Sequence, residues 1–360
     1  MDKNSKIYVA GHLGLVGSAI TKGLRQKGYT NIVTRSLDEL DLLDAVATEA
    51  FFKKERPEYL FQAAAKVGGI VANNVYRADF IYENLQIQNN LIHNSYKYGV
   101  KKLLFLGSTC VYPKEAPQPM SEDCLLTSPL EYTNEPYAIA KIAGLKMCES
   151  YNLQYGTNFI AVMPTNLYGP NDNFDLEKSH VLPAMIRKIH LAKLLHENNW
   201  EGIRNDFNCY PVEKVDGNAP EEAILEKLAK YGINNKQVEL WGTGKPMREF
   251  LWSEEMADAC IYIMERVGFE QLKKDKNEVR NCHINIGTGK EITIFDLAHL
   301  VKSTTGYNGN LFFNADKPDG TMRKLTDPSK LHELGWHHKI EIDEGVRRMY
   351  EWYQQKTNVD

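Results

Sequence analysis

The chain has 360 residues, of which 43% are hydrophobic and 25% are charged. This length fits one large domain or two joined domains, and the composition excludes disorder over most of the chain. Because 43 basic residues stand against 47 acidic ones, the net charge is −4, which gives no support to a nucleic-acid partner or a membrane-surface role. No apolar run approaches the ~18 to 20 residues that cross a bilayer, and we find no secretory signal. We therefore expect a cytoplasmic protein.

Six cysteines and ten histidines are scattered along the chain. The cysteines form no C-x-x-C pair and the histidines form no H-x-x-x-H pair. Disulfide scaffolds are dense in cysteine and zinc sites need close pairs. We therefore expect no metal site, and we interpret most of the cysteines as small buried hydrophobic side chains.

The first half of the chain alternates short apolar runs with helical stretches. Strands are predicted at residues 6–10, 32–34, 59–63, 103–106 and 159–163, and helices at residues 18–27, 45–55, 79–98 and 135–155. Continuous apolar strands separated by helices are typical of a parallel sheet covered on both faces. The expected fold class is α/β, a Rossmann doubly wound parallel sheet.

The second half is less regular. Strands are predicted at 238–241, 283–286 and 311–313, and helices at 221–230, 254–266, 294–304 and 343–355. Polar and turn residues fill 198–235, which we interpret as a surface insertion. We expect a cofactor-binding Rossmann domain at 1–168, to which a segment near 240–265 returns. A smaller C-terminal α/β domain at 169–360 would bind substrate.

Three glycines follow the first strand and precede the first helix, in the segment Gly11-His12-Leu13-Gly14-Leu15-Val16-Gly17. Glycine permits a tight turn and close approach of the backbone to a pyrophosphate, and the helix start offers unpaired N–H groups. The spacing is G-x-x-G-x-x-G, which differs from the commonest dehydrogenase pattern. In this strand–turn–helix context it predicts a dinucleotide site.

The end of the second strand distinguishes the two nicotinamide cofactors. An acid there accepts from the ribose 2′-hydroxyl, whereas a base pairs with a 2′-phosphate. This chain has Arg35 and no acid until Asp38, which favours NADP(H). The alternative is that Arg35 is only a solvated arginine at a strand end.

Tyr137 and Lys141 are four residues apart in a predicted helix, so they share one face. A nearby ammonium favours the phenolate, which helps the phenol exchange a proton near neutral pH. Ser108 ends an apolar strand about thirty residues upstream, where ligands bind in open α/β sheets. The three residues suit a reaction at a carbonyl, with Ser108 hydrogen-bonding the oxygen, Tyr137 exchanging the proton and a cofactor moving hydride.

The glycine turn, the serine and the tyrosine/lysine pair resemble the extended short-chain dehydrogenase/reductases that modify nucleotide sugars. Longer motifs narrow the resemblance to members that both epimerise and reduce a GDP-4-keto-6-deoxy sugar. These motifs cover nearly the whole chain except residues 198–235. They are AAAKVGGIVAN (63–73), GSTCVYP (107–113), NEPYAIAKIAG (134–144), MPTNLYGP (163–170), SHVLP (179–183), PMREF (246–250) and KPDGT (317–321).

The resemblance implies two further catalytic residues, Cys110 and His180. A C4 ketone acidifies the protons at C3 and C5, and inverting those carbons requires a base on one face of the sugar and an acid on the other. A thiolate and an imidazole can serve in these roles. Without the resemblance, Cys110 would be interpreted as a buried core thiol and His180 as a surface residue at a helix start.

The resemblance also assigns binding residues. For NADP(H) they are the glycine turn at 11–17, Arg35, Asp41, Leu42, Leu106, Gly107, Ser108, Thr109, Lys141, Pro164, Thr165, Asn166, Leu167 and His180. For the GDP-sugar they are Lys188, Trp241, Arg248 and Asp319, with the indole against guanine or sugar and the two cations on the diphosphate. The alternative for Trp241 is a core aromatic at a strand end.

The implied activity is NADPH-dependent 3,5-epimerisation and 4-reduction of GDP-4-keto-6-deoxy-D-mannose, with a related keto-heptose as the alternative substrate. Members that strongly prefer NADP usually carry arginines where this chain has Leu13 and Leu37. A 4,6-dehydratase needs acids where Thr109 and Cys110 stand, and a reductase without epimerase activity would be expected to lack Cys110 or His180. A non-enzymatic binding protein would be expected to lack the tyrosine or the lysine. The helix with that pair forms the family's usual dimer contact, so we expect a homodimer.

Overall fold

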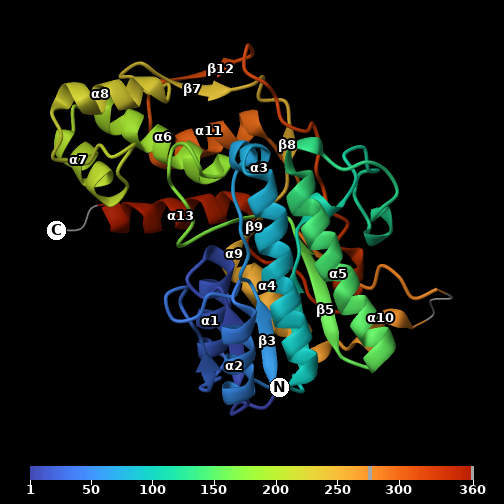
Figure 1. Ribbon diagram of the computed structural model, residues 1–360. Coiled ribbons are helices and arrows are strands. Elements are labelled where there is room, and N and C mark those ends of the chain that lie inside the picture. Colours follow the sequence, from blue (N-terminus) through green and yellow to red (C-terminus); the bar gives the residue numbers. More distant parts are fainter. Residues whose placement is uncertain (275–277, 358–360) are drawn as a thin grey trace. The chain divides into compact units, whose positions relative to one another are not determined.

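The computed structural model describes residues 1–274 and 278–357, and the chain divides into two units (Figure 1). The first unit joins Met1–Leu167, Phe250–Lys290 and Leu325–Lys339. The second unit joins Tyr168–Glu249, Glu291–Lys324 and the chain from Ile340 on. Each unit is therefore assembled from three separate stretches of sequence.

A six-stranded parallel sheet forms the centre of the first unit. Its strand order is β10-β5-β4-β3-β1-β2, and every neighbouring pair is parallel. The strands are β1 (Ile7–Ala10), β2 (Ile32–Val33), β3 (Tyr59–Gln62), β4 (Lys102–Leu106), β5 (Phe159–Pro164) and β10 (Ile284–Ile286). Each lies where the sequence predicted a strand, and the α/β doubly wound fold is confirmed.

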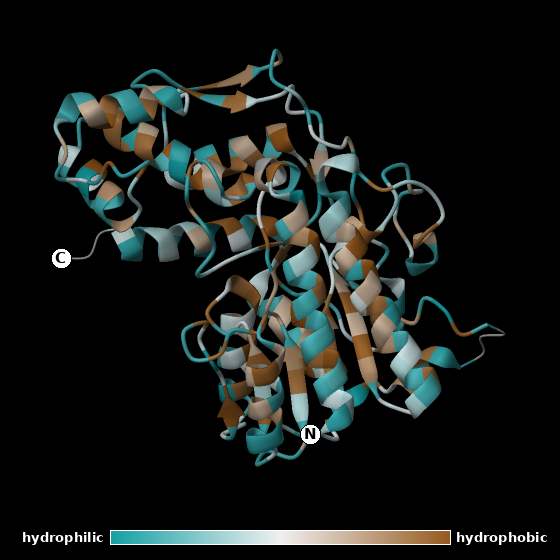
Figure 2. Cartoon of the chain, viewed as in Figure 1, coloured by the Kyte–Doolittle hydropathy of each residue, from teal (hydrophilic) through white to brown (hydrophobic). Residues whose placement is uncertain are grey.

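Helices cover both faces of this sheet, and the alternation of side chains along β1 shows how. Ile7 and Val9 pack with residues of α1 and α9, whereas Tyr8 and Ala10 pack with residues of α2, α4 and α5. Successive side chains of a strand point to opposite faces, so a strand covered on both sides must be apolar throughout. Figure 2 shows the apolar strands between helices that carry hydrophilic residues. The helices are α1 (Leu15–Gln26), α2 (Ala45–Glu55), α4 (Arg77–Lys97), α5 (Glu135–Tyr155) and α9 (Ser253–Arg266).

The chain changes direction across the sheet at β1, because β2 lies on one side of it and β3 on the other. Ligands of open parallel sheets bind outside the carboxyl ends of the strands at such a switch point. Here those ends are Ala10 and Gln62, which are paired in register. The glycine turn follows Ala10 directly, so it lies at this edge of the sheet.

Several short elements of the first unit were not predicted, because one or two turns contain too few residues for a periodic pattern. They are α3 (Ile70–Val75), α10 (Phe269–Lys273), α12 (Ser329–Glu333), β9 (Phe250–Trp252) and the 3-10 helices η1 (Thr109–Val111), η2 (Glu122–Cys124) and η3 (Tyr132–Asn134). The strand β6 (Asn166–Tyr168) was also not predicted.

The second unit is mostly helical. Its helices are α6 (Val181–His196), α7 (Trp200–Cys209), α8 (Glu221–Lys230), α11 (Ile294–Thr305) and α13 (Ile342–Thr357). Strand β7 (Gln237–Trp241) pairs in parallel with β12 (Asn310–Asn314), and β8 (Met247–Arg248) pairs antiparallel with β11 (Ile292–Thr293). The sequence did not predict α6 because this helix is buried on most of its sides, so it lacks the polar face that gives an amphipathic pattern.

Residues 198–235 are not a surface appendage. They form α7 and α8, and Ile203 and Phe207 of α7 are fully buried. The same helix supplies Asp206, whose carboxylate Oδ1 accepts from Arg187 Nε at 3.0 Å and from Nη2 at 2.8 Å. Both side chains of this ion pair are fully buried. The insertion therefore contributes to the core of the second unit.

Candidate active site

The glycine turn has the geometry of a dinucleotide-binding loop. Gly11 has φ +82°, and a Cβ there would approach Ala64 N to 2.6 Å. A Cβ on Gly17 would approach Gly11 O to 2.1 Å, whereas at Gly14 the nearest atom would be Gly11 O at 3.6 Å. Gly11 and Gly17 are thus required for close packing, and Gly14 is the N-cap of α1, where no side chain caps the first N–H groups of the helix. These features fit an anionic pyrophosphate.

Arg35 follows β2 and is already paired. Its Nη2 lies 2.7 Å from Glu55 Oε1, and its Nη1 donates to Thr34 O at 2.7 Å. Glu39 is a second acid near Arg35. Hydrogen bonds from Ser36 lower the pKa of Glu39, with smaller contributions from Arg35 and His12. A 2′-phosphate at Arg35 would therefore compete with Glu55 for the guanidinium.

Asp41 and Leu42 lie in the turn before α2. Asp41 Oδ1 accepts from Leu43 N at 2.9 Å, and Asn90 of α4 donates its side-chain amide to Leu42 O at 2.8 Å. Leu42 is buried. These bonds fix the turn in the first unit, which is the unit that carries the glycine turn.

The catalytic residues predicted in the first unit come together at the end of β4. Ser108 is the N-cap of η1, and its hydroxyl accepts from Cys110 N at 3.3 Å. Tyr137, in the first turn of α5, hydrogen-bonds to Ser108. Lys141 lies one turn further along α5, with Nζ donating to Leu106 O at 2.9 Å and lying 5.7 Å from the centre of the Tyr137 ring. Ser108, Cys110, Tyr137 and Lys141 therefore form one cluster.

The electrostatics of this cluster differ from the sequence expectation for the tyrosine. Loss of water raises the pKa of the Tyr137 phenol, the nearby Cys110 sulfur raises it further, and the bond to Ser108 opposes both. Burial lowers the pKa of Lys141 to about 8. The ammonium of Lys141 donates to the Leu106 carbonyl, and it does not lower the pKa of the Tyr137 phenol. A phenol that keeps its proton at neutral pH is suited to donate it to a carbonyl oxygen.

Cys110 has a polar neighbour that was not among the residues predicted from the sequence. Asn134, the residue before α5, donates its side-chain amide to Cys110 Sγ at 3.3 Å. The only sequence signal for this contact is that Asn134 opens the NEPYAIAKIAG motif. Distance along the chain hides the pair, because 24 residues separate the two.

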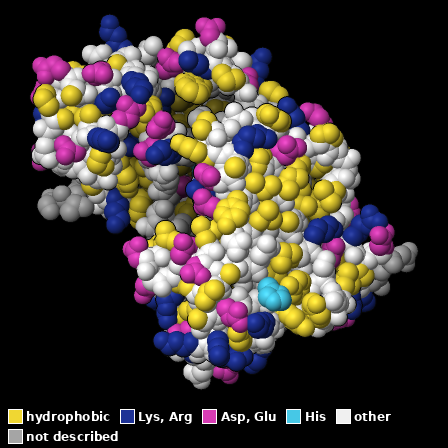
Figure 3. All heavy atoms as spheres, in the orientation of Figure 1, with side chains coloured by type: hydrophobic (Ala, Val, Ile, Leu, Met, Phe, Trp, Pro, Cys, Tyr) yellow, Lys and Arg dark blue, Asp and Glu magenta, His cyan; other side chains and the backbone are white. Residues whose placement is uncertain are grey.

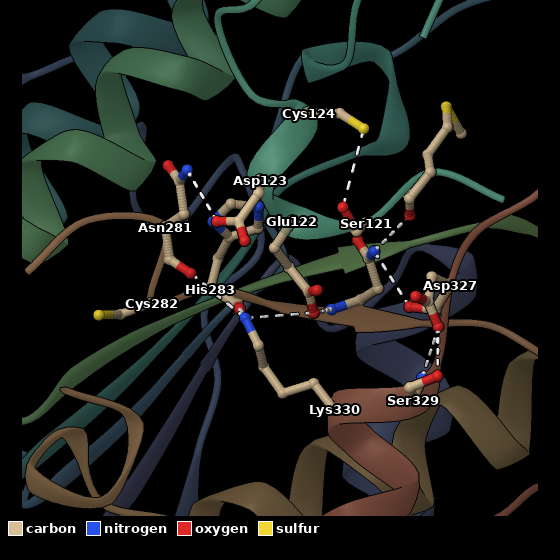
Figure 4. A network of polar contacts seen from close by, with 12 residues as sticks. Ser121, Glu122, Asp123, Cys124, Asn281, Cys282, His283, Asp327, Ser329 and Lys330 are labelled. Carbon is tan, nitrogen blue, oxygen red and sulfur yellow. Dashed lines mark hydrogen bonds and ion pairs between the residues drawn. The ribbon is translucent and has the colours of Figure 1, made fainter. Parts of the chain in front are cut away.

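A buried polar network holds the loop that follows Cys110. Tyr112 donates to Asn285 Oδ1 at 2.5 Å and lies 3.0 Å from His283 Nε2. Asn285 N in turn donates to Glu122 Oε1 at 2.9 Å. Figure 4 shows Lys330 reaching toward Glu122, to which its Nζ lies at 3.5 Å. The network ties this loop to β10 and α12, and nothing in the sequence indicated it.

The loop after β5 meets the same edge of the sheet. Pro164 ends β5 and pairs in register with Ile286 of β10, and Thr165 N donates to Ile286 O at 3.0 Å. The glycine turn, the 106–109 segment and the 164–167 segment each follow the carboxyl end of a parallel strand. These three segments contain most of the predicted cofactor residues of the first unit. The exceptions are Lys141 and the residues of the Arg35 and Asp41 turns.

The predicted GDP-sugar residues belong to the second unit. Lys188 Nζ donates to Glu239 O of β7 at 2.6 Å, and burial lowers the pKa of Lys188 to about 8, with Glu239 opposing. Trp241 ends β7 and is 62% exposed, so the core interpretation is wrong. The Lys317 ammonium lies 5.4 Å from the centre of the Trp241 ring.

The two remaining residues predicted to bind the GDP-sugar, Arg248 and Asp319, lie near each other. Arg248 Nη1 donates to Thr321 O at 2.6 Å, and burial lowers the pKa of Arg248 while Asp319 opposes that effect. Asp319 accepts from Thr243 N and from Thr243 Oγ1, each at 2.8 Å. A partly buried arginine and a partly buried lysine, together with an exposed indole, can bind a nucleoside diphosphate.

His180 also belongs to the second unit. It is the N-cap of α6, its side chain makes no capping bond, and it is exposed. Cys110 belongs to the first unit, so the placement of these two residues on opposite faces of one sugar stays a prediction. Within the described ranges no cluster of three or more histidine, cysteine or acidic side chains is arranged to hold a metal ion.

Comparison with known proteins gives a consistent result. Residues 7–206 and 207–287 match the NAD dependent epimerase/dehydratase family. GDP-L-fucose synthase 1 of Arabidopsis thaliana is 49% identical over 353 residues, covering 98% of this chain and 94% of its own. GDP-L-fucose synthase of Escherichia coli K12 is 47% identical over 348 residues, covering 97% and 96%. The structure of a GDP-D-glycero-L-gluco-heptose synthase from Campylobacter jejuni in the presence of NADPH is 49% identical, with TM-score 0.92, and the match covers 98% of this chain and 99% of that one.

The Rossmann sheet and the Ser108–Tyr137–Lys141 cluster define a nicotinamide-dependent dehydrogenase/reductase of the extended short-chain type. The chain belongs to the NAD dependent epimerase/dehydratase family.

Proposed function

We propose that this protein has GDP-L-fucose synthase activity, converting GDP-4-keto-6-deoxy-D-mannose and NADPH to GDP-L-fucose and NADP⁺. The observation that carries the proposal is the thiol of Cys110 in the same cluster as the phenol of Tyr137. One group serves epimerisation and the other serves reduction. Full-length similarity to two GDP-L-fucose synthases supports the same activity.

For the epimerisation, the C4 ketone acidifies the hydrogens at C3 and C5. The Cys110 thiolate takes a proton from the ring carbon and becomes a thiol, and the resulting enolate receives a proton on its other face from His180. Each inversion exchanges one carbon-bound hydrogen with solvent. A thiolate can serve as the base of such an inversion and a protonated imidazole as its acid.

For the reduction, the bound nicotinamide would supply a hydride to C4. The tight packing of the glycine turn and the helix start without a side-chain cap support the assignment of this turn to the cofactor's pyrophosphate. Tyr137 donates its proton to the C4 oxygen, and Ser108 hydrogen-bonds to that oxygen and to the phenol. The raised pKa of Tyr137 keeps the proton available until the oxygen becomes basic.

For the nucleotide, Lys188 and Arg248 would neutralise the diphosphate and Trp241 would pack on guanine or sugar. The exposure of Trp241 and its position at the end of β7, whose Glu239 carbonyl holds Lys188, support this assignment. Asp319, close to Arg248, is positioned to accept from a hydroxyl or an amine of the ligand.

A second candidate function is the equivalent reaction on a GDP-4-keto-heptose. The Campylobacter jejuni heptose synthase supports it, because it resembles this chain as strongly as the fucose synthases do. The two functions share every proposed catalytic step and differ in whether the bound sugar carries one more carbon.

The homodimer is part of the proposal, and so is a cytoplasmic location. Hydrophobic side chains gather over α4 and α5 in Figure 3. Exposed residues of these helices include Tyr82, Tyr96, Ile139, Leu153 and Tyr155. Apolar surface of this kind marks protein interfaces.

Within residues 1–274 and 278–357, every helix falls short of the length or the apolarity needed to cross a membrane.

The proposal is tested by incubating the protein in D2O with GDP-4-keto-6-deoxy-D-mannose or a GDP-4-keto-6-deoxy-heptose, and with NADPH or NADH. NMR of the product should show deuterium at C3 and C5 and the L-fuco configuration with the hexose and NADPH. Faster turnover of the heptose would favour the second candidate. Reduction without deuterium incorporation would rule out the epimerase half.

A further inference from the structure

The side chain of Asn134 is committed to the cysteine and not to its own helix. Its Nδ2 donates to Cys110 Sγ at 3.3 Å. Asn134 is the N-cap of α5, yet it makes no side-chain capping bond, although asparagine is among the preferred capping residues. Its Oδ1 is buried without a hydrogen-bond partner. The side-chain amide of Asn134 therefore does not cap α5, and its hydrogen bond is made to the sulfur of Cys110.

The segment that carries Asn134 is held in place from other elements. Arg77, at the start of α4, donates to Tyr132 O at 2.8 Å, and its guanidinium lies 4.4 Å from the centre of the Tyr132 ring. Asn134 N donates to Glu131 O at 3.2 Å. The amide group therefore starts from a fixed backbone, which favours one direction for its N–H bond.

The position of the sulfur favours a negative charge. A hydrogen bond donated to an ionisable group stabilises its charged form, and an amide cannot supply the proton that a thiolate lacks. The residue whose amide contacts the sulfur, Asn134, is also the N-cap of the 21-residue helix α5, and a helix N-terminus carries positive partial charge. Cysteines at helix starts are activated in this way.

We infer that Asn134 is a positioning residue that stabilises the Cys110 thiolate and directs it toward the carbon acid of the sugar. This role rests on the proposed epimerase activity. It assigns a function to an asparagine three residues before Tyr137, so that the base of one reaction and the acid of the other are organised by the same turn of α5.

The test compares three variants, Asn134→Ala, Asn134→Ser and Asn134→Asp. If Asn134 only capped α5, serine and aspartate would support activity as well as asparagine does, and alanine would be worst. If it stabilises a thiolate, aspartate must be worst, because it has the same shape but places a second negative charge beside the sulfur. Alanine and serine should then be intermediate and similar, since neither supplies the amide donor.

Two measurements follow these variants. The first is the pH at which iodoacetamide alkylates Cys110 at half its maximal rate, read by mass spectrometry of the peptide. The second is the rate of deuterium incorporation at C3 and C5 of GDP-4-keto-6-deoxy-D-mannose. Loss of one hydrogen bond to a charged group predicts, for Asn134→Ala, an upward shift of about one pH unit and an exchange rate reduced about tenfold. Asn134→Asp should show larger changes in both.

The outcomes separate this inference from the proposed function. Wild-type protein that reduces the ketone without exchange would refute the epimerase proposal, and the alkylation series would still test the contact with Asn134. Wild-type exchange combined with an unchanged alkylation midpoint in Asn134→Ala and Asn134→Asp would overturn the inference. Thermal unfolding controls for folding, and if Asn134→Ala is unstable, the serine and aspartate variants alone give the ranking.

Discussion

The two groups of site residues are built in different ways. In the first unit, Ser108, Tyr137 and Lys141 bond to one another or to the backbone of β4, and both the phenol and the ammonium have shifted pKa values because they are removed from water. In the second unit, an exposed indole stands beside cations that hold backbone carbonyls. Proton transfer requires fixed partners at low dielectric, whereas binding a diphosphate requires positive charges that a ligand can reach from solvent.

Removing the hydroxyl of Tyr137 should have the largest effect on activity. In Tyr137→Phe the turnover number for reduction should fall about 10² to 10⁴-fold, the usual contribution of a general acid, while deuterium exchange at C3 and C5 persists. The matched control is Tyr151→Phe, on the same helix, whose hydroxyl bonds His93 outside the cluster. Reduction by Tyr137→Phe at the wild-type rate would contradict the division of roles.

The insertion should matter for stability more than for chemistry. Asp206→Ala leaves the fully buried Arg187 without its carboxylate, so the free energy of unfolding should fall by about 3 to 5 kcal/mol in urea titration. The control is Glu344→Ala on α13, which removes exposed ion pairs with Arg347 and Arg348 and should change stability very little. Equal effects of the two substitutions would show that the buried pair is not a core element.

Lys188 should make GDP binding sensitive to alkaline pH. Because burial lowers its pKa to about 8, it is charged at pH 7 and loses its proton as the pH rises above 8. The dissociation constant of GDP, measured by calorimetry, should therefore increase about tenfold between pH 7 and pH 9.5, the order expected when one ion pair with phosphate is lost. In Lys188→Arg the charge persists, so a flat profile is expected. The same rise in the arginine variant would assign the effect to another group.

The smallest effect concerns cofactor choice. Glu55→Gln releases Arg35 from its ion pair, so the dissociation constant of NADPH should fall a few-fold while that of NADH stays constant. Glu49→Gln is the control on the same helix, since Glu49 pairs with Lys97 and not with Arg35. An equal change for both cofactors would show that Arg35 does not contact the 2′-phosphate.

The parts of the fold that follow local rules were predictable from sequence. β1 is apolar at every position because helices cover both faces of the sheet, and α5 was placed with its observed ends, Glu135 and Tyr155. The glycine turn was predictable because Gly11 and Gly17 each meet a backbone atom that excludes any side chain.

What could not be predicted depends on contacts between distant residues. Helix α6 has no polar face, because neighbouring elements bury it on most sides, and a pattern of 3.6 residues cannot reveal such a helix. The ion pair of Arg35 with Glu55, the amide of Asn134 on Cys110 and the burial of Asp206 all join residues that the sequence separates by 19 or more positions. The predicted direction of the Tyr137 pKa was wrong for the same reason, since loss of water and the nearby Cys110 raise this pKa and only the bond to Ser108 opposes them.

The order in which the first unit is assembled has a consequence for its synthesis. Strand β10 pairs with β5 more than a hundred residues earlier, and α9 covers the face of the sheet that α1 shares. A nascent chain that has emerged only to Leu167 thus carries the cofactor loop on an unfinished sheet, with the apolar side of α1 uncovered. Such long-range closure folds slowly, and we expect the ribosome-bound intermediate to depend on chaperones until the chain has emerged past Lys339.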